Sequence, residues 1–549
     1  MIIKKNHFFS NFNNVSLKSY LTVSILIVVT LSVVVIISSE NDISRYLRGF
    51  NGVIFSHNSG NYSESFELKL RTLNPLTKIY YTLDGTEPTL NSTLYSEPIQ
   101  ITNNTTVRAK SFINENTYSL TFTNSFFFNE NISIPIVTIS VDPKDLYDTE
   151  TGILGLNYSN RGQEWQKPIN FEIIEEGVRN NLKQDLTIRV SGGSSRKLAQ
   201  KSFRLCADSK VGINYINYNL FSKDLPRTKC FLLRNFGNDW GHSLIRDVLL
   251  QKNSESTGIN FQRHKFVNVF INGEYYSLAS MQEYHDAFYF SEKYGGDPQN
   301  YEILENTIDK SGRPSVIYGN EAVRDEIVNL IKVMDNDEIS TKEKYDIFLQ
   351  SFDVDNYIDY QLLNTYYGNI DWITSNTRYF RYNPEFASKT NDLQMERDGK
   401  WRFFLQDLDS SFGLANEERG YSDRDDNMIK RASDQIFQNN TKINVMFREL
   451  LKNDTFKIKF FNRYKELRSS IFMPEHIIKN IDEYEKTLEP HIEKYNSKWK
   501  GSILYNDKVF DQDKEKWMNK MQELRDYANQ RPEKYDKDIK EVLGIDYEL

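Results

Sequence analysis

The chain has 549 residues, of which 39% are hydrophobic and 26% are charged. A chain of this length folds into about two to four domains, and this composition is typical of folded proteins rather than of disordered segments. The net charge of −8 excludes a protein that binds nucleic acid over a broad basic surface, so no nucleic-acid partner is expected.

The cysteine and histidine content excludes two further classes of protein. Two cysteines, Cys206 and Cys230, are too few for a disulfide-dense scaffold or a four-cysteine zinc site. They form one disulfide if the chain is exported, or they remain two buried thiols, and the sequence leaves both alternatives open. Seven histidines occur without a His-Glu-x-x-His motif, which argues against a zinc hydrolase.

An uncharged apolar segment covers residues 19–39. About 20 apolar residues are enough for a helix to cross a bilayer, so this segment predicts a single transmembrane helix. Lys4, Lys5 and Lys18 precede it, which places residues 1–18 in the cytoplasm and the main body outside, anchored in the cell membrane. A cleaved signal peptide is the alternative, although its apolar region is normally shorter.

Residues 52–129 show the pattern of a small, immunoglobulin-like β-sandwich. Apolar and polar residues alternate in Phe66–Leu70 and in Thr105–Phe112, as expected of strands buried on one face. The segment Tyr81–Thr89, with its Asp-Gly-Thr-x-Pro core, and the following Val107–Lys110 resemble the module found at the end of chitobiases and related β-hexosaminidases. This resemblance implies an accessory module, either a structural spacer or a carbohydrate-binding domain.

Residues 132–545 predict one larger α+β domain. Strand patterns and helical spacing mix up to about residue 290, helices dominate from residue 320, and charged amphipathic helices fill the part from about residue 440. A strand, a glycine-containing loop, a strand with a lysine, a helix, a hairpin, helices and acidic loops follow one another. This is the element order of a two-lobed protein kinase.

The first half of this domain contains candidate nucleotide-binding residues. Gly192 and Gly193 lie in the small-residue loop between two predicted strands, where glycine permits a close approach of backbone N–H groups to phosphates. Lys201 begins the returning strand and has the position of the lysine that holds the α- and β-phosphates in kinases. Taken alone, Lys201 has the features of an ordinary surface lysine.

The second half contains candidate catalytic and metal-binding residues. Asp371 and Asn376 have the spacing of the kinase catalytic loop, in which the aspartate orients the attacking hydroxyl and the asparagine binds a metal. Asp407 and Asp409 follow the apolar strand Trp401–Leu405. On an extended segment both carboxylates point to the same side and can reach one Mg²⁺ ion.

These motifs together resemble the spore-coat CotH kinase family. The resemblance extends from about residue 132 to beyond residue 447, and it rests on these segments: Arg189–Ser195, Lys201–Leu205, Leu232–Asn235, Leu244–Asp247, Asn272–Tyr275, Asn369–Asp371 and Gln406–Asp409. It implies an atypical protein-kinase-like fold, ATP with Mg²⁺ or Mn²⁺ as cofactors, and phosphorylation of serine (or threonine) on a surface or extracytoplasmic protein.

The family pattern also implies a role for each candidate. Lys201 is expected to bind phosphate, Asp371 to act as the catalytic acid/base, and Asn376 and Asp407 to ligate the metal, with Asp409 as a second acidic ligand. Glu283, after the predicted hairpin, is expected where a hinge meets adenine. Arg234 and Arg246 suit phosphate contact and structural ion pairing equally well.

Two other functions remain as alternatives. Asp-x-Asp after an apolar strand is also the way in which metal-dependent glycosyltransferases hold a nucleotide sugar, but the chain lacks a serial βαβ pattern. A surface adhesin or pseudokinase scaffold is the second alternative. Its weakness is that a pure binder has no need for Lys201, Asp371, Asn376 and Asp407 together.

Overall fold

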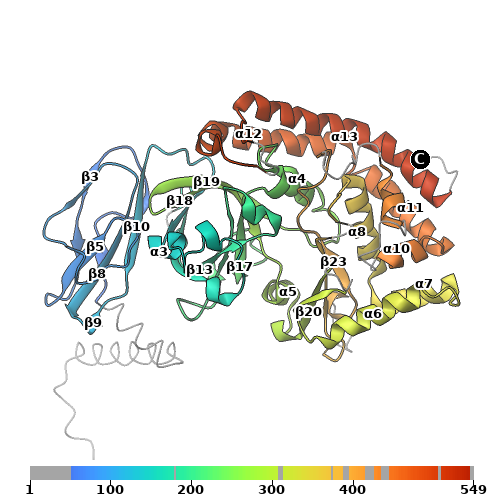
Figure 1. Cartoon of the computed structure of the whole chain (residues 1–549), viewed down its shortest axis with the longest axis horizontal. Coiled ribbons are helices and arrows are strands. Elements are labelled where there is room, and N and C mark those ends of the chain that lie inside the picture. Colours follow the sequence, from blue (N-terminus) through green and yellow to red (C-terminus); the bar gives the residue numbers. More distant parts are fainter. Residues whose placement is uncertain are drawn as a thin grey trace, which may run out of the picture. The chain divides into compact units, whose positions relative to one another are not determined.

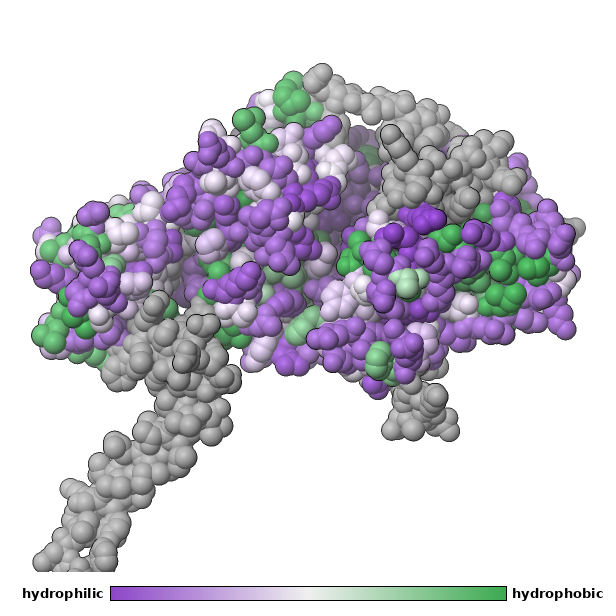
Figure 2. Space-filling view, turned by 60° about the horizontal axis from the view of Figure 1, so that its bottom comes forward, coloured by the Kyte–Doolittle hydropathy of each residue, from purple (hydrophilic) through white to green (hydrophobic). Residues whose placement is uncertain are grey.

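The computed structural model describes residues 51–178, 181–306, 313–372, 375–386, 395–414, 426–433, 444–504 and 509–544. The chain divides into two compact units, Met1–Phe128 and Asn129–Leu549, which are described separately (Figure 1). On the face drawn in Figure 2, hydrophilic residues predominate and apolar ones gather only in scattered groups.

The first unit is all-β in its described part. Its main sheet has the order β2-β10-β8-β5-β6 with β9 beside β8, and two small sheets pair β1 with β4 and β3 with β7. The strands are β1 (Ile54–Phe55), β2 (Gly60–Tyr62), β3 (Phe66–Leu68), β4 (Leu70–Arg71), β5 (Lys78–Thr82), β6 (Thr93–Leu94), β7 (Ile99–Ile101), β8 (Thr105–Asn114), β9 (Thr117–Tyr118) and β10 (Phe122–Phe128). Val107, Ala109 and Phe126 are fully buried between the sheets.

The second unit begins with a closed barrel of order β11-β12-β13-β14-β17-β19-β18. Its strands are β11 (Ile136–Ser140), β12 (Lys167–Ile174), β13 (Lys183–Ser191), β14 (Ser202–Cys206), β17 (Cys230–Arg234), β18 (His264–Ile271) and β19 (Glu274–Glu283). Three short elements lie between these strands in the chain: α3 (Pro143–Tyr147), β15 (Ile216–Asn217) and β16 (Arg227–Thr228). A disulfide joins Cys206 to Cys230, which are paired neighbours on β14 and β17.

A second sheet, of order β21-β20-β22-β23, and a set of helices complete this unit (Figure 1). The strands are β20 (Tyr301–Asn306), β21 (Ser315–Tyr318), β22 (Thr377–Tyr382) and β23 (Arg402–Phe404). The helices are α4 (Arg246–Asn253), α5 (Ala287–Tyr294), α6 (Ala322–Met334), α7 (Thr341–Ser351), α8 (Val354–Tyr367), α9 (Met428–Ser433), α10 (Asn444–Leu450), α11 (Asp454–Arg468), α12 (Pro474–Trp499) and α13 (Lys514–Leu543). One large apolar core unites α4, α8, β23 and α10–α13.

The structure corrects one part of the predicted fold class. The chain is α+β, with a β-rich N-terminal region and a helical C-terminal part. However, no helix within the described ranges is long and apolar enough to cross a membrane. The transmembrane helix therefore does not belong to the fold described here. The segment 19–39 on which it was predicted lies outside the described residues.

Candidate active site

A cavity of about 380 Å³ lies beside β13, β14 and β17 and extends to the second sheet. This volume is typical of small-molecule sites. We call it the arginine cleft, because its lining includes Arg161, Arg189, Arg196, Arg204, Arg234 and Arg378. The loop glycines Gly192 and Gly193 line it too, and so do Glu305, Asn376, Gln406 and Asp407.

Strand alternation explains which barrel residues reach the cleft. On β14, Phe203 and Leu205 point into the barrel core, so Ser202 and Arg204 point outward and line the cleft. The neighbouring strands follow the same pattern. Leu186 and Ile188 on β13 and Phe231 and Leu233 on β17 fill the core, while Arg189, Leu232 and Arg234 line the cleft.

Four of the cleft arginines form no ion pair with any residue in the described part of the chain. They are Arg161, Arg189, Arg196 and Arg204, whereas Arg378 pairs with Glu305 at 2.8 Å. Arg189 and Arg204 are moreover direct cross-strand partners on β13 and β14. Like charges placed opposite each other destabilise a sheet. The arrangement therefore suits an anionic ligand that supplies the missing negative charge.

The loop after β13 brings its backbone to the cleft wall. Gly192 has φ of 105°, which favours glycine, and a Cβ there would also meet Ser195 Oγ. A Cβ at Gly193 would meet open space. Both glycines line the cleft as predicted, and the loop that they open is followed by a short 3-10 turn, Ser194–Lys197.

Lys201 does not line the arginine cleft. Its Nζ donates to the carbonyl oxygens of Arg196 (2.8 Å) and Leu198 (2.6 Å) and lies over the ring of Tyr158. Lys201 shares its strand parity with Phe203 and Leu205, which face the barrel core, and alternation turns it away from the side that Arg204 occupies. The structure thus places Arg204, and not Lys201, among the cations that face the cleft.

Asp371 is held just after α8 by local hydrogen bonds. α8 ends at Gly368, which adopts the left-handed conformation with φ of 67°, and the side chain of Asn369 then accepts from the amides of Asp371 and Trp372. The amide of Ile370 donates to the Ser410 carbonyl. This bond ties the predicted catalytic loop to the Asp-x-Asp segment.

A hydroxyl group connects Asp371 to the second acidic residue of that segment. Ser410 Oγ lies 3.1 Å from Asp371 Oδ2 and 3.4 Å from Asp409 Oδ1. Asn238 donates to both Asp409 and Ser410. Asp371 itself is not in the cleft lining, but this chain of bonds places it next to the acidic cluster at the cleft.

Three carboxylates converge on the guanidinium of Arg234. Arg234 lies 3.3 Å from Asp247, 2.6 Å from Asp407 and 2.9 Å from Asp409. Burial acts to raise the pKa of Asp407, but the charge of Arg234 outweighs it and holds that pKa below its usual range. Burial and the charge of Asp407 raise the pKa of Asp409. The cluster therefore lacks positive charge, with three acids facing one arginine.

The donor set fits a divalent metal of the Mg²⁺ type. The excess of negative charge around Arg234 and the oxygen donors of Asp407 and Asp409 suit a hard cation, and Asn376 lines the same cleft. Within the described ranges, no group of three or more His, Cys, Asp or Glu side chains is arranged to hold a metal ion. Mg²⁺ is commonly held by one or two carboxylates together with water and phosphate oxygens, so a two-acid site is sufficient.

Backbone strain marks two of the predicted metal ligands. Asn376 and Asp407 have φ of 59° and 53°, in the left-handed region that residues other than glycine seldom adopt. Such strain often occurs at functional sites, where the surrounding structure has to maintain it. Leu408 N donates to Asp247 Oδ1, which anchors the strained segment to α4.

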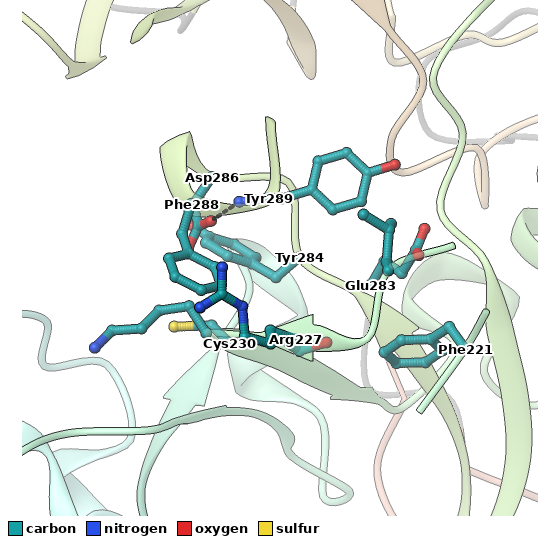
Figure 3. Close-up of a pocket in the computed structure, with 11 residues that line it drawn as sticks. Phe221, Arg227, Cys230, Glu283, Tyr284, Asp286, Phe288 and Tyr289 are labelled. Atoms are coloured by element: carbon teal, nitrogen blue, oxygen red, sulfur yellow. Dashed lines mark hydrogen bonds between the residues drawn. The ribbon is translucent and has the colours of Figure 1, made fainter. Parts of the chain in front are cut away.

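Glu283 lies beside the cleft rather than in its lining. It borders a separate cavity of about 10 Å³, large enough for one water molecule at most (Figure 3). Its Oε2 accepts from the Arg263 amide and its carbonyl accepts from Gln262 Nε2. The adjacent residues Tyr284 and His285 line the cleft, and Glu283 does not.

Arg246 has a structural position. It is 2% exposed, it does not line the cleft, and its guanidinium and amide both bond to Asp239. This answers the question left open by the sequence: Arg246 forms a buried ion pair, whereas Arg234 combines ion pairs with a place in the cleft lining.

Replacement of Arg246 by methionine should lower the free energy of unfolding by about 3–5 kcal/mol, because Asp239 would be left as an uncompensated buried charge. Urea unfolding followed by circular dichroism measures this loss. Arg161→Met, at an exposed arginine without an ion pair in the described residues, is the matched control and should change stability by less than about 0.5 kcal/mol. Equal small effects for both variants would contradict the assignment.

Comparison with known protein families agrees with this geometry. The family described as CotH kinase protein matches residues 188–535, which is more than half of the chain. The chain belongs to the CotH kinase family. This membership confirms the resemblance seen in the sequence, and it indicates protein kinase activity with ATP and a divalent metal. The CotH match includes β14, β17 and both acidic loops of the arginine cleft.

The first unit has a family match of its own. The chitobiase/beta-hexosaminidase C-terminal domain family matches residues 57–123, which confirms the second resemblance. A search of the curated proteins found no match. Carbohydrate binding by this unit stays a prediction.

Proposed function

We propose that this CotH-family chain transfers the γ-phosphate of ATP to a serine or threonine hydroxyl of a protein. The observation that carries the proposal is the cross-strand pair Arg189 and Arg204. These two cations are cross-strand partners that form no ion pair with any described residue, and they line the same cleft as the glycine loop and Asp407. A triphosphate supplies the negative charge that this wall of the cleft lacks.

Each group of residues has its own role in this phosphoryl transfer. Arg189 and Arg204 hold phosphate oxygens, and Asp407, Asp409 and Asn376 would hold the divalent metal, which when bound neutralises charge on the transferring phosphate. The carboxylate of Asp371 orients the acceptor hydroxyl and takes its proton. The hydroxyl oxygen bonds to the γ-phosphorus while the bond from that phosphorus to the bridging oxygen of ADP breaks.

Nucleotide binding tests the proposal and separates it from the glycosyltransferase alternative. Calorimetry on the full-length protein should show binding of ATP that requires Mg²⁺ or Mn²⁺, and a uridine diphosphate sugar should not compete. Preference for the nucleotide sugar would favour the glycosyltransferase. Absence of binding to either nucleotide would favour a scaffold.

We also propose that the kinase body works outside the cytoplasm. The disulfide between Cys206 and Cys230 supports this, because disulfides persist mainly in oxidising compartments. Protein isolated from its host in the presence of an alkylating agent should yield a linked pair of cysteine peptides. Two alkylated cysteines would contradict the proposal.

A further inference from the structure

Two cations, Arg196 and Lys201, brace the glycine loop at the edge of the arginine cleft. Arg196 donates to the carbonyl oxygens of Gly192 (2.7 Å), Val190 (2.8 Å), Tyr158 and Asn160 (both 2.9 Å). Lys201 donates to the carbonyl oxygens of Arg196 and Leu198, and its own amide donates to the hydroxyl of Tyr276 at 2.8 Å. The loop is thus tied to the barrel almost entirely through its carbonyl groups.

The bonding of these cations is unusual for their burial. Arg196 is 7% exposed, and neither Arg196 nor Lys201 forms an ion pair with any described residue. Burial lowers the pKa of Lys201 to about 8. Burying a cation without a counter-charge costs stability, and here only carbonyl dipoles and the ring of Tyr158 offset that cost. A purely structural contact would not require a charge at this position.

The amides and the carbonyls of the loop differ in their hydrogen bonding. The N–H groups of Gly192, Gly193, Ser194 and Ser195 donate no hydrogen bond to any described residue, while the carbonyls of Val190, Gly192, Arg196 and Leu198 are all occupied by the two cations. Backbone N–H groups attract phosphate oxygens, whereas free carbonyl oxygens repel them. Occupied carbonyls leave the loop with donors available and acceptors satisfied.

We propose that Lys201, together with Arg196, is a positioning residue that keeps the carbonyls of the 192–198 loop engaged, so that its amides stay available to the nucleotide phosphates. Lys201 acts through the loop and does not touch the phosphates. This inference rests on the proposed function for its ligand, ATP, but the state of the loop can be measured without any nucleotide.

Amide hydrogen exchange on the nucleotide-free, full-length protein tests the brace directly. Lys201→Met should increase exchange of the Arg196 and Leu198 amides, which donate to the carbonyls of Gly193 and Ser195, by about 10-fold or more. Lys201→Gln, which keeps donors but loses the charge, should give an intermediate increase. Lys197→Met is the matched control, since Lys197 is exposed on the same turn, and should exchange like the wild type. Unchanged exchange in Lys201→Met and Lys201→Gln would overturn the proposal.

Steady-state kinetics then distinguish a positioning lysine from a catalytic one. Lys201→Met should raise KM for ATP by about 10-fold with kcat changed less than about twofold, as expected for lost ground-state binding. A fall in kcat of about 100-fold or more at unchanged KM would show that Lys201 acts on the reacting phosphate, and would overturn the proposal. If the wild type does not bind ATP, the proposed function fails, while the exchange measurement still decides whether Lys201 braces the loop.

Discussion

Replacing Asp371 with alanine should reduce kcat for phosphoryl transfer by about 10²–10⁴-fold, the range expected for loss of a catalytic acid or base. Asp371 makes its hydrogen bonds at the surface of the loop after α8, and Ile370 and Asn369 hold that loop independently of the carboxylate. The variant should therefore fold normally. Phosphate incorporation from γ-labelled ATP, with circular dichroism to check folding, measures both expectations.

Asp407→Ala should also abolish transfer, for a different reason. Arg234 would keep Asp247 and Asp409 as partners, so the fold should survive, but one carboxylate of the metal site would be lost. The matched control is Asp355→Ala, at an exposed acid near the start of α8. If Asp371→Ala and Asp407→Ala both retain wild-type rates, the assignment of the site is wrong.

The second large effect is expected from the arginine pair on β13 and β14. Arg204→Met should weaken ATP binding by about 10- to 100-fold, since a hydrogen bond to a charged group contributes about 1.5–3 kcal/mol. The same variant should stabilise the nucleotide-free protein by about 0.2–1 kcal/mol, because it removes a like-charge pair from adjacent strands. Calorimetry and urea unfolding measure these two opposite changes.

Weaker ATP binding combined with higher stability is specific to a phosphate-binding arginine. An arginine with a purely structural role would give a destabilised variant with unaltered ATP affinity. Arg189→Met should behave like Arg204→Met, because the two residues are cross-strand partners. Arg378→Met should instead lower stability, since it would remove the ion-pair partner of Glu305 on β20. Loss of stability together with normal binding in Arg204→Met would contradict the phosphate-binding role.

The sequence directs attention to the acidic side of the candidate site, of which Asn376 and Asp407 line the cleft. The spacing of Asp371 and Asn376, and two aspartates after an apolar strand, identify residues that the structure gathers around the arginine cleft. Local order is enough here, because α8 ends at Tyr367, shortly before Asp371, and β23 ends at Phe404, shortly before the Asp-x-Asp segment. The chain of hydrogen bonds through Ser410 was not foreseeable, since it joins segments that are distant in sequence.

The cationic side was harder to predict, for a reason of strand geometry. Lys201 has the position of the phosphate-binding lysine in a kinase-like order of elements, but along the strand it alternates in phase with Phe203 and Leu205, which fill the barrel. Counting by twos from those apolar residues would have selected Arg204 instead. The same count selects Arg189, which alternates with Leu186 and Ile188 of the core. Arg378 could not be found in this way, because its approach to the cleft depends on β22 joining the second sheet.

Phosphoryl transfer is tested by phosphate incorporation from γ-labelled ATP by the full-length protein with Mg²⁺ or Mn²⁺, beside the Asp407→Ala variant. We expect label on the protein or on a serine-rich acceptor with the wild type only, and none when the metal is removed by a chelator. Metal-dependent ATP binding without any transfer of label, or equal labelling by the wild type and by Asp407→Ala, would contradict this expectation.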